Sequence, residues 1–494
     1  MRDRIRPHLN QLSLAVIFLV LVSSTVVWAI RDKTPPPWDP ADHLSASYDY
    51  FRYLAKLDLA GFAHEFFIEK HFYAPLAHLI TALVFVAFGA SRLTGIVVNF
   101  LSLAVLLTSV VWIARRLYAA TPHGDKAAGA KESSFSKELT FSKELTFSKE
   151  LTFSGAPIFA AGMVAALLAT CYHFPAWLLH DAFLDYPLMA MVTASFALLI
   201  RADDFRSRHD AFLFGVSAGL GMLTKQTYAF FLFLPALYAA MRVLRARDLK
   251  AITNLLLAAL VAVAIAAVWY GPHLDDVLEI YRANREAAIS ENEAPLFSFK
   301  SNVFYLHALV SAQMQLPFAI LFLGGLIYSL ARRRRQSVML YLWLVSGLLM
   351  FALVANKDIR YTVPVLPAAA LLSVCWLGEF RGRRQAALAT PIVVWAFVSF
   401  FNAQWPAAGM GAYIDIPEYR FMVFGRNYYG FDHRPLNHDW SVPEVVRAVS
   451  EHHADSRLLA AEKVNSFEKV NSFEKVNSLV GGAAGKGGPP VLGV

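Results

Sequence analysis

"LAVIFLVLVSSTVVWAI", residues 14–30, is an unbroken apolar run near the N-terminus. A helix of roughly 17–25 apolar residues crosses the ~30 Å hydrocarbon layer of a bilayer, so this run is long enough to span it. Arg2, Arg4 and Arg6 precede the run, as basic residues precede a signal-peptide core. The apolar stretch is longer than the usual signal core and no small-x-small cleavage site follows. We therefore interpret it as a retained first membrane span.

The composition indicates many such runs. The 494 residues are 57% hydrophobic, 14% aromatic and only 17% charged, which excludes an ordinary soluble domain of this size. The two cysteines, Cys171 and Cys375, fall in or beside apolar runs, so no disulfide framework is expected. The formal net charge of +8 comes largely from basic residues between the apolar runs. These residues serve membrane orientation, and we expect no nucleic-acid partner.

The predicted fold class is an all-α polytopic membrane protein with about eleven transmembrane helices. The expected spans are 14–30, 93–114, 156–171, 185–200, 211–223, 227–241, 251–271, 316–331, 337–355, 362–378 and 386–402. One further apolar run, Pro75–Gly89, is omitted because it is short and His71, Tyr73 and His78 crowd its start. We expect it to lie flat at the interface, as one of the juxtamembrane helices of a first outer loop at 31–92.

The distribution of basic residues supports this topology. One set of alternate loops carries 24 Lys and Arg in 85 residues, and consists of 1–13, 115–155, 201–210, 242–250, 332–336 and 379–385. The opposite set carries 12 in 128 residues, and consists of 31–92, 172–184, 224–226, 272–315 and 356–361. Cytoplasmic loops are the basic ones, so the N-terminus is predicted inside and the C-terminus outside. A span at 75–89 would place "RRRR" (332–335) outside, which contradicts this rule.

The domain organisation follows from these spans. Residues 1–402 form the predicted membrane domain, 403–460 are a candidate small periplasmic segment, and 461–494 form a repeat-containing tail. "FSKELT" occurs three times in 135–152 and "EKVNS" recurs through 462–478. These repeats are too short for a solenoid and indicate local duplication. The glycine- and proline-rich end of the tail predicts disorder.

The segment "WDPADH", after the first span, contains the first candidate catalytic residues, Asp39, Asp42 and His43. Asp39 followed by Pro40 is also typical of a helix N-cap, and acidic groups there complement the helix dipole. Capping explains both aspartates without a function, but it does not explain His43. The residues share one helical face, so a capping aspartate can also be a catalytic one.

Asp185 and Lys225 are charged residues at the mouths of expected spans. Asp185 can cap the span that follows it, and Lys225 can snorkel to the lipid headgroups. The alternative is functional, because ionisable residues at such positions are costly unless they are wet, paired or used in the site. A lysine there can bind the phosphate of a lipid or a diphosphate.

Three more cations complete an outward basic group: Arg92, Lys357 and Arg360. Contact with outer-leaflet lipid is the simpler interpretation of each. Together with Lys225 and the carboxylates they predict one pocket suited to transfer from a lipid-linked phosphate. The cations would stabilise charge developing on the leaving phosphate, and a carboxylate would accept a proton from the acceptor.

These motifs resemble the GT-C-type membrane glycosyltransferases, specifically glycosyltransferase family 39, the protein-mannosyltransferase and aminoarabinose-transferase class. The resemblance covers most of residues 10–402. Its motifs, in family order, are "WDPADHLSASYDYF", "HFYAPLAHLITALVFVAFGASRLTGIVVNFLSLAVLL", "HDAFLDYPLMAMV", "GLGMLTKQTYAFFLFLP", "WYGPHL" and "KDIRYTVPVLPAAALL".

The resemblance implies an inverting transfer of a sugar, a hexose or a pentose, from a polyprenyl-phosphate donor to a protein, lipid or glycan acceptor. The reaction would take place on the outer face of a bacterial cytoplasmic membrane. Asp39 matches the family's catalytic aspartate, Asp185 matches a second acidic position, and Lys225 and Arg360 match basic positions that hold the lipid phosphate. Asp39-Pro40 replaces the family's Asp-Glu, so Asp42 or His43 is expected to take the place of the missing Glu.

A divalent metal ion near the site is another implication of the resemblance. The candidate ligands are Glu65 and His71, with Asp39 and His43 as further options. Their spacing matches no standard metal motif.

Two other classes of function remain open at this stage. A transporter or flippase of lipid-linked sugars would share the spans and the basic pocket. Charges in transporters usually sit near the midplane on broken helices, and we find no repeat symmetry of that kind in the sequence. A non-catalytic membrane scaffold would make the grouping of charges accidental. The sequence favours the glycosyltransferase, because the charges gather on one face.

Overall fold

A computed structural model describes residues 2–119, 156–333, 337–406, 411–427, 432–438, 440–441 and 444. The chain divides into two compact units, Met1–Leu436 and Asn437–Val494. The repeats at 135–152 and 462–478 and the tail at 461–494 lie outside the described residues, so the expectations for them stay predictions. The following description concerns Met1–Leu436.

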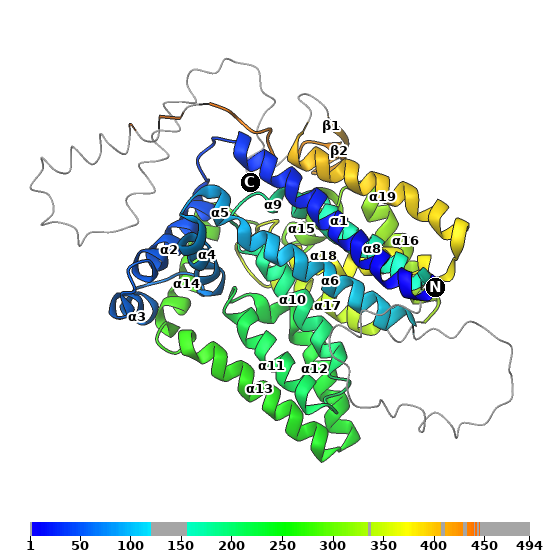
Figure 1. Cartoon of the computed structure of the whole chain (residues 1–494), viewed down its shortest axis with the longest axis horizontal. Coiled ribbons are helices and arrows are strands. Elements are labelled where there is room, and N and C mark those ends of the chain that lie inside the picture. The colour runs from blue at the N-terminus through cyan, green and yellow to red at the C-terminus, as the bar shows by residue number, and fades with distance from the viewer. Residues whose placement is uncertain are drawn as a thin grey trace, which may run out of the picture. The chain divides into compact units, whose positions relative to one another are not determined.

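This unit consists almost entirely of helices (Figure 1). The helices of its first half are α1 (Arg2–Arg31), α2 (Trp38–Leu54), α3 (Leu59–Phe67), α4 (Leu76–Phe88), α5 (Arg92–Gly95), α6 (Val97–Ala119), α8 (Ala156–Cys171), α9 (His173–Leu178), α10 (Asp185–Arg201), α11 (Arg208–Met222) and α12 (Tyr228–Ala246). The others are α13 (Leu249–Tyr270), α14 (Leu274–Ser290), α15 (Phe299–Ala308), α16 (Leu316–Ala331), α17 (Val338–Ala352), α18 (Leu366–Val374) and α19 (Gly382–Gln404). The described residues also include a π-helical turn, η1 (Leu309–Gln313), and two 3-10 turns, η3 (Val363–Val365) and η4 (Leu377–Glu379).

Nine of the eleven predicted spans coincide with one helix each, 93–114 coincides with α5 and α6, and 362–378 with η3, α18 and η4 in succession. This helical content confirms the all-α polytopic fold class. Among the described residues, five helices are long and apolar enough to cross a membrane by length and composition, namely α1, α6 with α5, α12, α13 and α19. A sixth crossing arises if the pair α15–η1 and α16, bent by 117°, forms one broken span. The protein is therefore an integral membrane protein, and the total of eleven crossings stays a prediction.

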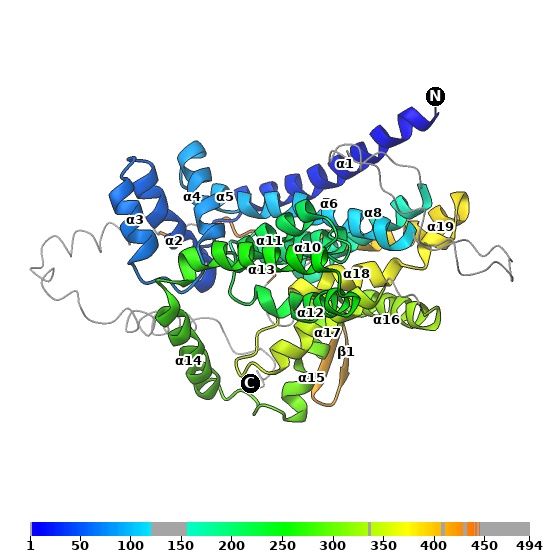
Figure 2. The same cartoon turned by 90° about the horizontal axis from the view of Figure 1, so that it is seen from below.

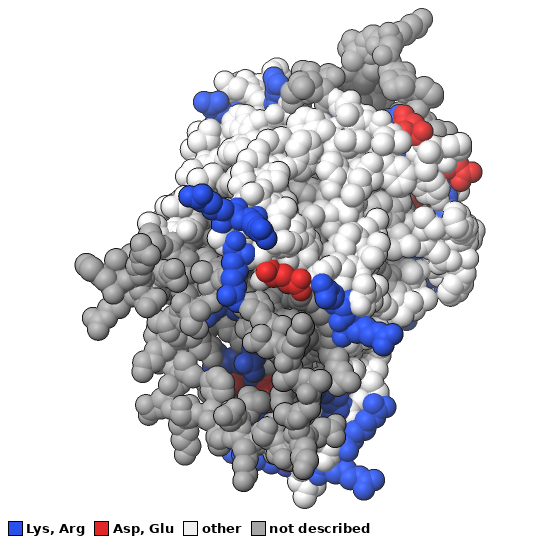
Figure 3. Space-filling view, turned by 90° about the vertical axis from the view of Figure 1, so that its right-hand side faces the viewer, with Lys and Arg blue, Asp and Glu red and all other residues white. Residues whose placement is uncertain are grey.

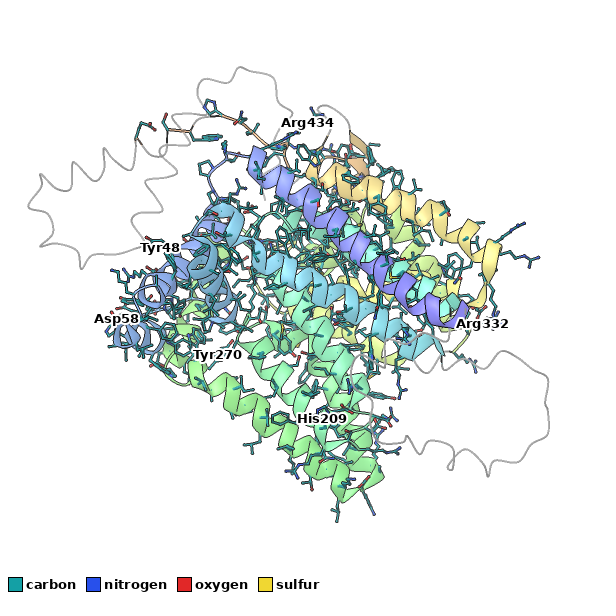
Figure 4. All side chains as sticks on the ribbon, in the orientation of Figure 1. Tyr48, Asp58, His209, Tyr270, Arg332 and Arg434 are labelled. Carbon is teal, nitrogen blue, oxygen red and sulfur yellow. The ribbon has the colours of Figure 1, made fainter. Side chains whose placement is uncertain are left out.

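The loops gather at two opposite ends of the helices (Figure 4). His209 and Arg332 come from loops predicted inside. His209 lies at the bottom of the view and Arg332 at the right, where the N-terminus of α1 also lies (Figures 1 and 4). Tyr48, Asp58 and Arg434, from segments predicted outside, lie toward the left and top of the same view. Lysine and arginine predominate over acidic side chains on the face that Figure 3 shows, which is the right-hand side of Figure 1. The alternation of basic and less basic loops thus corresponds to two physical ends.

The first outer loop forms a cluster of short helices, α2, α3 and α4, which lie together in both views (Figures 1 and 2). The helix α4 has 13 residues, too few for a crossing, and packs against α2, as expected of a juxtamembrane helix. It ends at Gly89, whose φ of 83° favours glycine. Asp58 caps α3 by accepting from the Gly61 amide at 2.8 Å, which fixes the turn after α2.

The core lies where α8, α9, α10 and α18 are buried on almost all sides. Around it the helices approach closely, because small residues stand at the contacts. A Cβ added to Gly215 on α11 would lie 2.5 Å from the carbonyl oxygen of Ala258 on α13. These two helices therefore pack almost backbone to backbone, as membrane helices with small interface residues do.

Three features were not predicted. The helices α14 and α15 follow α13 outside the expected spans. The chain then breaks between η1 and α16, where Gln315 has a φ of 76°, in the left-handed region that non-glycine residues rarely occupy. After α19, strands β1 (Gly411–Ile416) and β2 (Tyr419–Gly425) form an antiparallel hairpin with a register irregularity between Ala412 and Tyr413.

Candidate active site

The site begins at the first turn of α2. Pro37 precedes the helix and no side chain caps it, so the capping interpretation of Asp39 was wrong. Instead, the Arg360 guanidinium donates from Nη1 to Asp39 Oδ2 at 2.6 Å. The Asp39 side chain is 25% exposed and the Arg360 side chain 8%. Asp39 is thus a paired carboxylate that still reaches the surface.

Arg360 lies in the loop between α17 and η3, and it is held there by Asp358. The Asp358 carboxylate accepts from Arg360 Nε at 2.8 Å and from Nη2 at 2.5 Å, and its other oxygen accepts from the Arg360 backbone amide at 2.8 Å. The guanidinium also lies over the ring of Phe183, with its carbon 4.7 Å from the centroid. These contacts fix the fork of the guanidinium toward α2.

The second pair joins α10 to the turn between α11 and α12. Lys225 donates from Nζ to Asp185 Oδ1 at 2.7 Å, with side-chain exposures of 10% and 2%. Asp185 begins α10 but its side chain caps nothing. Both simpler interpretations were therefore wrong: Asp185 does not cap α10, and Lys225 does not snorkel to the headgroups. A buried ion pair of this kind is retained only with good geometry.

Two tyrosines place the two ion pairs in one cluster. The Lys225 ammonium lies 5.5 Å from the centroid of the Tyr361 ring. Burial raises the pKa of Tyr361; Asp358, Asp185 and Asp39 raise it further, and Arg360 lowers it. Burial likewise raises the pKa of Tyr73, with Asp39 and Asp185 adding to the effect. Asp39, Asp185 and Arg360 thus act electrostatically on the same phenol, and Lys225 lies against its ring.

His43 lies at the edge of this cluster and is paired with a second histidine. Its Nδ1 atom is 3.2 Å from Nε2 of His78 on α4, and both residues are buried. Burial lowers the pKa of His43 well below its ordinary value, and the charges of His78, Lys225 and Arg360 lower it further. Burial lowers the pKa of His78 to about 3. The histidine pair is therefore neutral at neutral pH and joins α2 to α4.

Asp42 lies one turn of helix from the cluster and faces solvent. Partial desolvation of its carboxyl group by the surrounding protein and the charge of Asp39 raise its pKa. It is near Asp39 but makes no hydrogen bond to the site within the described part of the chain. Asp42 and His43 thus differ in their surroundings, although they are adjacent in the sequence.

The π-helical turn η1 supports the Arg360 loop through hydrogen bonds from one residue, Gln313. Gln313 donates from Nε2 to the carbonyl oxygen of Ile359 at 2.5 Å and to Thr362 Oγ1 at 2.9 Å. These two acceptors lie on either side of Arg360 in the chain. π-helical turns are often found at functional sites, and this one presents a buried amide to the loop of the site.

Arg92 belongs to a different cluster, at the outer end of α1. It donates from Nη1 to Asp32 Oδ2 at 2.6 Å and to the Thr34 carbonyl oxygen at 2.7 Å. Its guanidinium lies 5.3 Å from the Trp28 ring centroid, and His180 stacks on the same indole at 3.7 Å. The structure therefore places Arg92 with Asp32 instead of with Arg360.

Lys357 is turned toward the end of α17. Its Nζ atom donates to the carbonyl oxygens of Phe351 at 3.1 Å and Ala352 at 3.0 Å, and lies 5.2 Å from the Tyr305 ring centroid. Burial lowers the pKa of Lys357 to about 8, although Glu293 raises it. The side chain satisfies helix carbonyls that would otherwise lack a partner.

The candidate metal ligands Glu65 and His71 do lie together. Glu65 Oε1 is 3.3 Å from His71 Nε2, and Arg52 Nη2 is 3.5 Å from Glu65 Oε2. Tyr50 stacks against the His71 ring at 5.4 Å. Within the described part of the chain, no group of three or more His, Cys, Asp or Glu residues could hold a metal ion. His71 Nε2 also lies 3.0 Å from the backbone carbonyl oxygen of Glu65, so a hydrogen bond joins the two residues.

Of the residues that the sequence singled out, Asp39, Asp185, Lys225 and Arg360 form the candidate site. Sequence reasoning left out Asp358 and Tyr361 as site residues, although both flank Arg360 in "NKDIRY". In the sequence, Tyr73 served only as an argument against a membrane span at Pro75–Gly89. Gln313 had no local signal, because its role depends on a contact with a loop 46 and 49 residues away.

The cluster combines a partly exposed carboxylate, Asp39, with two cations in fixed positions, Arg360 and Lys225. This combination suits proton removal beside a developing phosphate charge. Residues 157–270, most of α8 to α13, match the family described as dolichyl-phosphate-mannose-protein mannosyltransferase. This segment contains Asp185 and Lys225, one of the two ion pairs.

Two solved structures and one curated relative are similar to the chain. ArnT from Cupriavidus metallidurans bound to undecaprenyl phosphate aligns with a TM-score of 0.50 over 76% of this chain and 62% of that one, at 18% identity. Its apo form aligns with a TM-score of 0.48 over 77% and 62%, at 17% identity. An uncharacterized protein of Aquifex aeolicus (strain VF5) is 27% identical over 110 residues, 22% of this chain and 21% of that protein.

The chain thus spans less than two thirds of the length of these relatives. The resemblance to the GT-C-type membrane glycosyltransferases is confirmed by the family segment and by the shared fold.

Proposed function

We propose that the protein transfers a sugar from a polyprenyl-phosphate donor to an acceptor, with inversion at the anomeric carbon. The family segment and the shared fold support this proposal. The observation that carries the proposal is the convergence of Asp39–Arg360 and Asp185–Lys225 around Tyr361. ArnT was solved with undecaprenyl phosphate bound, which supports a polyprenyl phosphate as the lipid carrier.

The two carboxylates differ in a way that divides their roles. Asp39 is 25% exposed, so an acceptor hydroxyl can reach it, whereas the Asp185 side chain is 2% exposed. Asp39 would therefore act as the general base, and Asp185 would hold Lys225 in place. A base must lie within hydrogen-bond reach of the proton that it removes.

The reaction can be written with these groups. Asp39 takes the proton of the acceptor hydroxyl, and the acceptor oxygen bonds to the anomeric carbon. The bond from that carbon to the donor phosphate oxygen breaks, and its electron pair leaves with the polyprenyl phosphate. Arg360 and Lys225 stabilise the charge that develops on this phosphate. Attack from the side opposite the phosphate inverts the anomeric carbon.

The orientation of the site is part of the proposal. The helix α2, whose first turn carries Asp39, lies at the left of Figure 1, opposite the right-hand side that Figure 3 shows. Because basic loops stay in the cytoplasm, the site would face the periplasm of a bacterial inner membrane. The acceptor would then be a protein, lipid or glycan on that side.

The test uses purified protein reconstituted in lipid vesicles with undecaprenyl-phosphate-linked arabinose, mannose or glucose as the donor and with lipid A or a serine-containing peptide as the acceptor. It measures release of undecaprenyl phosphate. Asp39→Asn should lower the rate on the accepted donor by about 10²–10⁴-fold, the usual contribution of a general base. Asp49→Asn is the matched control, because Asp49 lies on the same helix and pairs with Arg52 at the surface. Full activity in the Asp39 variant would refute the proposal.

The flippase alternative is separated by the same variant. A flippase would release no undecaprenyl phosphate, but it would move a fluorescent polyprenyl-phosphate sugar across the vesicle membrane. If both variants flip this lipid at the wild-type rate and none hydrolyses or transfers it, the transporter interpretation replaces the enzyme.

A further inference from the structure

An open groove runs along the surface where α1 meets α19. Its volume is about 510 Å³, and it is lined by Leu19, Val20, Ser23, Ser24, Val27, Phe401 and Trp405. The α1 residues follow helical spacing, so they form one continuous stripe. This groove is separate from the candidate active site and shares none of its residues.

A basic residue, Arg31, lies at the outer end of the stripe. Arg31 stands one turn after Val27, and its guanidinium lies 5.6 Å from the centroid of the Trp405 ring. Arg31 is exposed, and no described carboxylate lies within ion-pair distance of it. Tryptophan and arginine together are typical of the level of the lipid headgroups.

The length of the stripe corresponds to one leaflet. From Leu19 to Arg31 the helix rises about 18 Å at ~1.5 Å per residue. Half of a ~30 Å hydrocarbon layer, with part of the headgroup region, has the same depth. A lipid with its chain beside Val20 and Val27 would therefore place its phosphate at Arg31.

We propose that this groove binds an anionic glycerophospholipid of the leaflet on the side of the candidate active site. The acyl chain lies in the groove, and the phosphate accepts hydrogen bonds from Arg31, whose planar fork suits phosphate oxygens. The indole of Trp405 fixes the guanidinium from the other side. The proposal does not depend on the proposed function.

A second copy of the chain fits the groove less well. A two-fold dimer with its axis along the membrane normal brings the same stripe of both copies face to face. The two Arg31 side chains would then meet at the same height without a described acid between them, and like charges at that position repel. A lipid phosphate supplies the missing opposite charge.

The test counts lipids retained by the full-length protein in native mass spectra, after incubation with equimolar phosphatidylglycerol and phosphatidylcholine. We expect one retained phosphatidylglycerol, preferred about fivefold, as for one cation near an anionic surface. Arg31→Gln should abolish the preference, and Ser23→Phe should abolish retention by filling the groove.

Two controls are matched to these changes. Lys56→Gln removes an exposed cation from the turn after α2, and Leu260→Phe enlarges a lipid-facing side chain of α13. Both should retain the preference. Equal retention of the two lipids by the wild type, or an unchanged preference in Arg31→Gln, would overturn the proposal. A dimer mass lost in Ser23→Phe would assign the groove to a second copy.

Discussion

The ion pair between Lys225 and Asp185 allows a quantitative prediction. Lys225→Met leaves the Asp185 carboxylate, with 2% of its side chain exposed, without its cation. Two unit charges about 4 Å apart interact by ~4 kcal/mol at an effective dielectric constant of ~20. Loss of one partner from a buried pair costs about 3–5 kcal/mol. We therefore expect this variant to lower the free energy of unfolding by about 3–5 kcal/mol.

Removal of both charges should be much less harmful. In Lys225→Met with Asp185→Asn no uncompensated charge remains, so most of the lost stability should return. The difference between the double variant and the sum of the single variants is the coupling energy of the pair. Its magnitude should be at least about 2 kcal/mol, measured by equilibrium unfolding in mixed detergent micelles.

An exposed ion pair of similar length provides the control. Arg242 Nη2 lies 2.6 Å from Asp204 Oδ2, but the two side chains are 53% and 24% exposed. Its coupling energy should stay within about 0.2–1 kcal/mol, because water screens both charges. If the two cycles gave equal coupling energies, burial would not be what makes the Lys225–Asp185 pair matter, and the reasoning would fail.

Three further predictions concern the surroundings of the site. Gln313→Leu frees the Arg360 loop and should lower kcat about 10–100-fold with little change in KM, measured by donor turnover; an unchanged kcat would show that the loop is fixed without this amide. In the wild type the free energy of unfolding should rise between pH 8 and 10.5, because the unfolded chain binds a proton there that folded Lys357, with a pKa of about 8, has lost. Lys357→Met should remove this rise, which is measured as the pH profile of unfolding. Arg92→Gln leaves a buried Asp32 unpaired, so the melting temperature should fall while KM for the donor stays constant, and a raised KM would instead return Arg92 to the phosphate site.

The helices were predictable because a bilayer sets a simple length rule. Every expected span is helical, and the exclusion of Pro75–Gly89 agrees with α4, a 13-residue helix packed on α2. The number of lysine and arginine residues in each loop predicted which loops lie on the same side of the membrane. This rule needs only the charge of each loop and no tertiary contact. The broken helix at Gln315 was missed, since no local rule predicts a non-glycine residue with a φ of 76°.

The candidate site was predictable only as a set of residues. Local rules assigned Asp39 and Asp185 to helix caps, but the structure pairs them with Arg360 and Lys225 instead. Asp39 and Arg360 are 321 positions apart in the chain. Their pairing depends on where the loop after α17 lies over α2, which in turn depends on the packing of several helices.

The amino-acid sequence alone determined that the protein lies in a membrane, which segments are apolar helices, that successive loops alternate between the two sides, and which charged residues are candidates for the site. Each of these follows from hydropathy and charge along the chain. Only the folded protein decided which acid meets which cation, that Arg92 and Lys357 turn elsewhere, and that Gln313 supports the loop. Those choices require side chains from distant helices to share one buried volume, where an unpaired charge is too costly to remain.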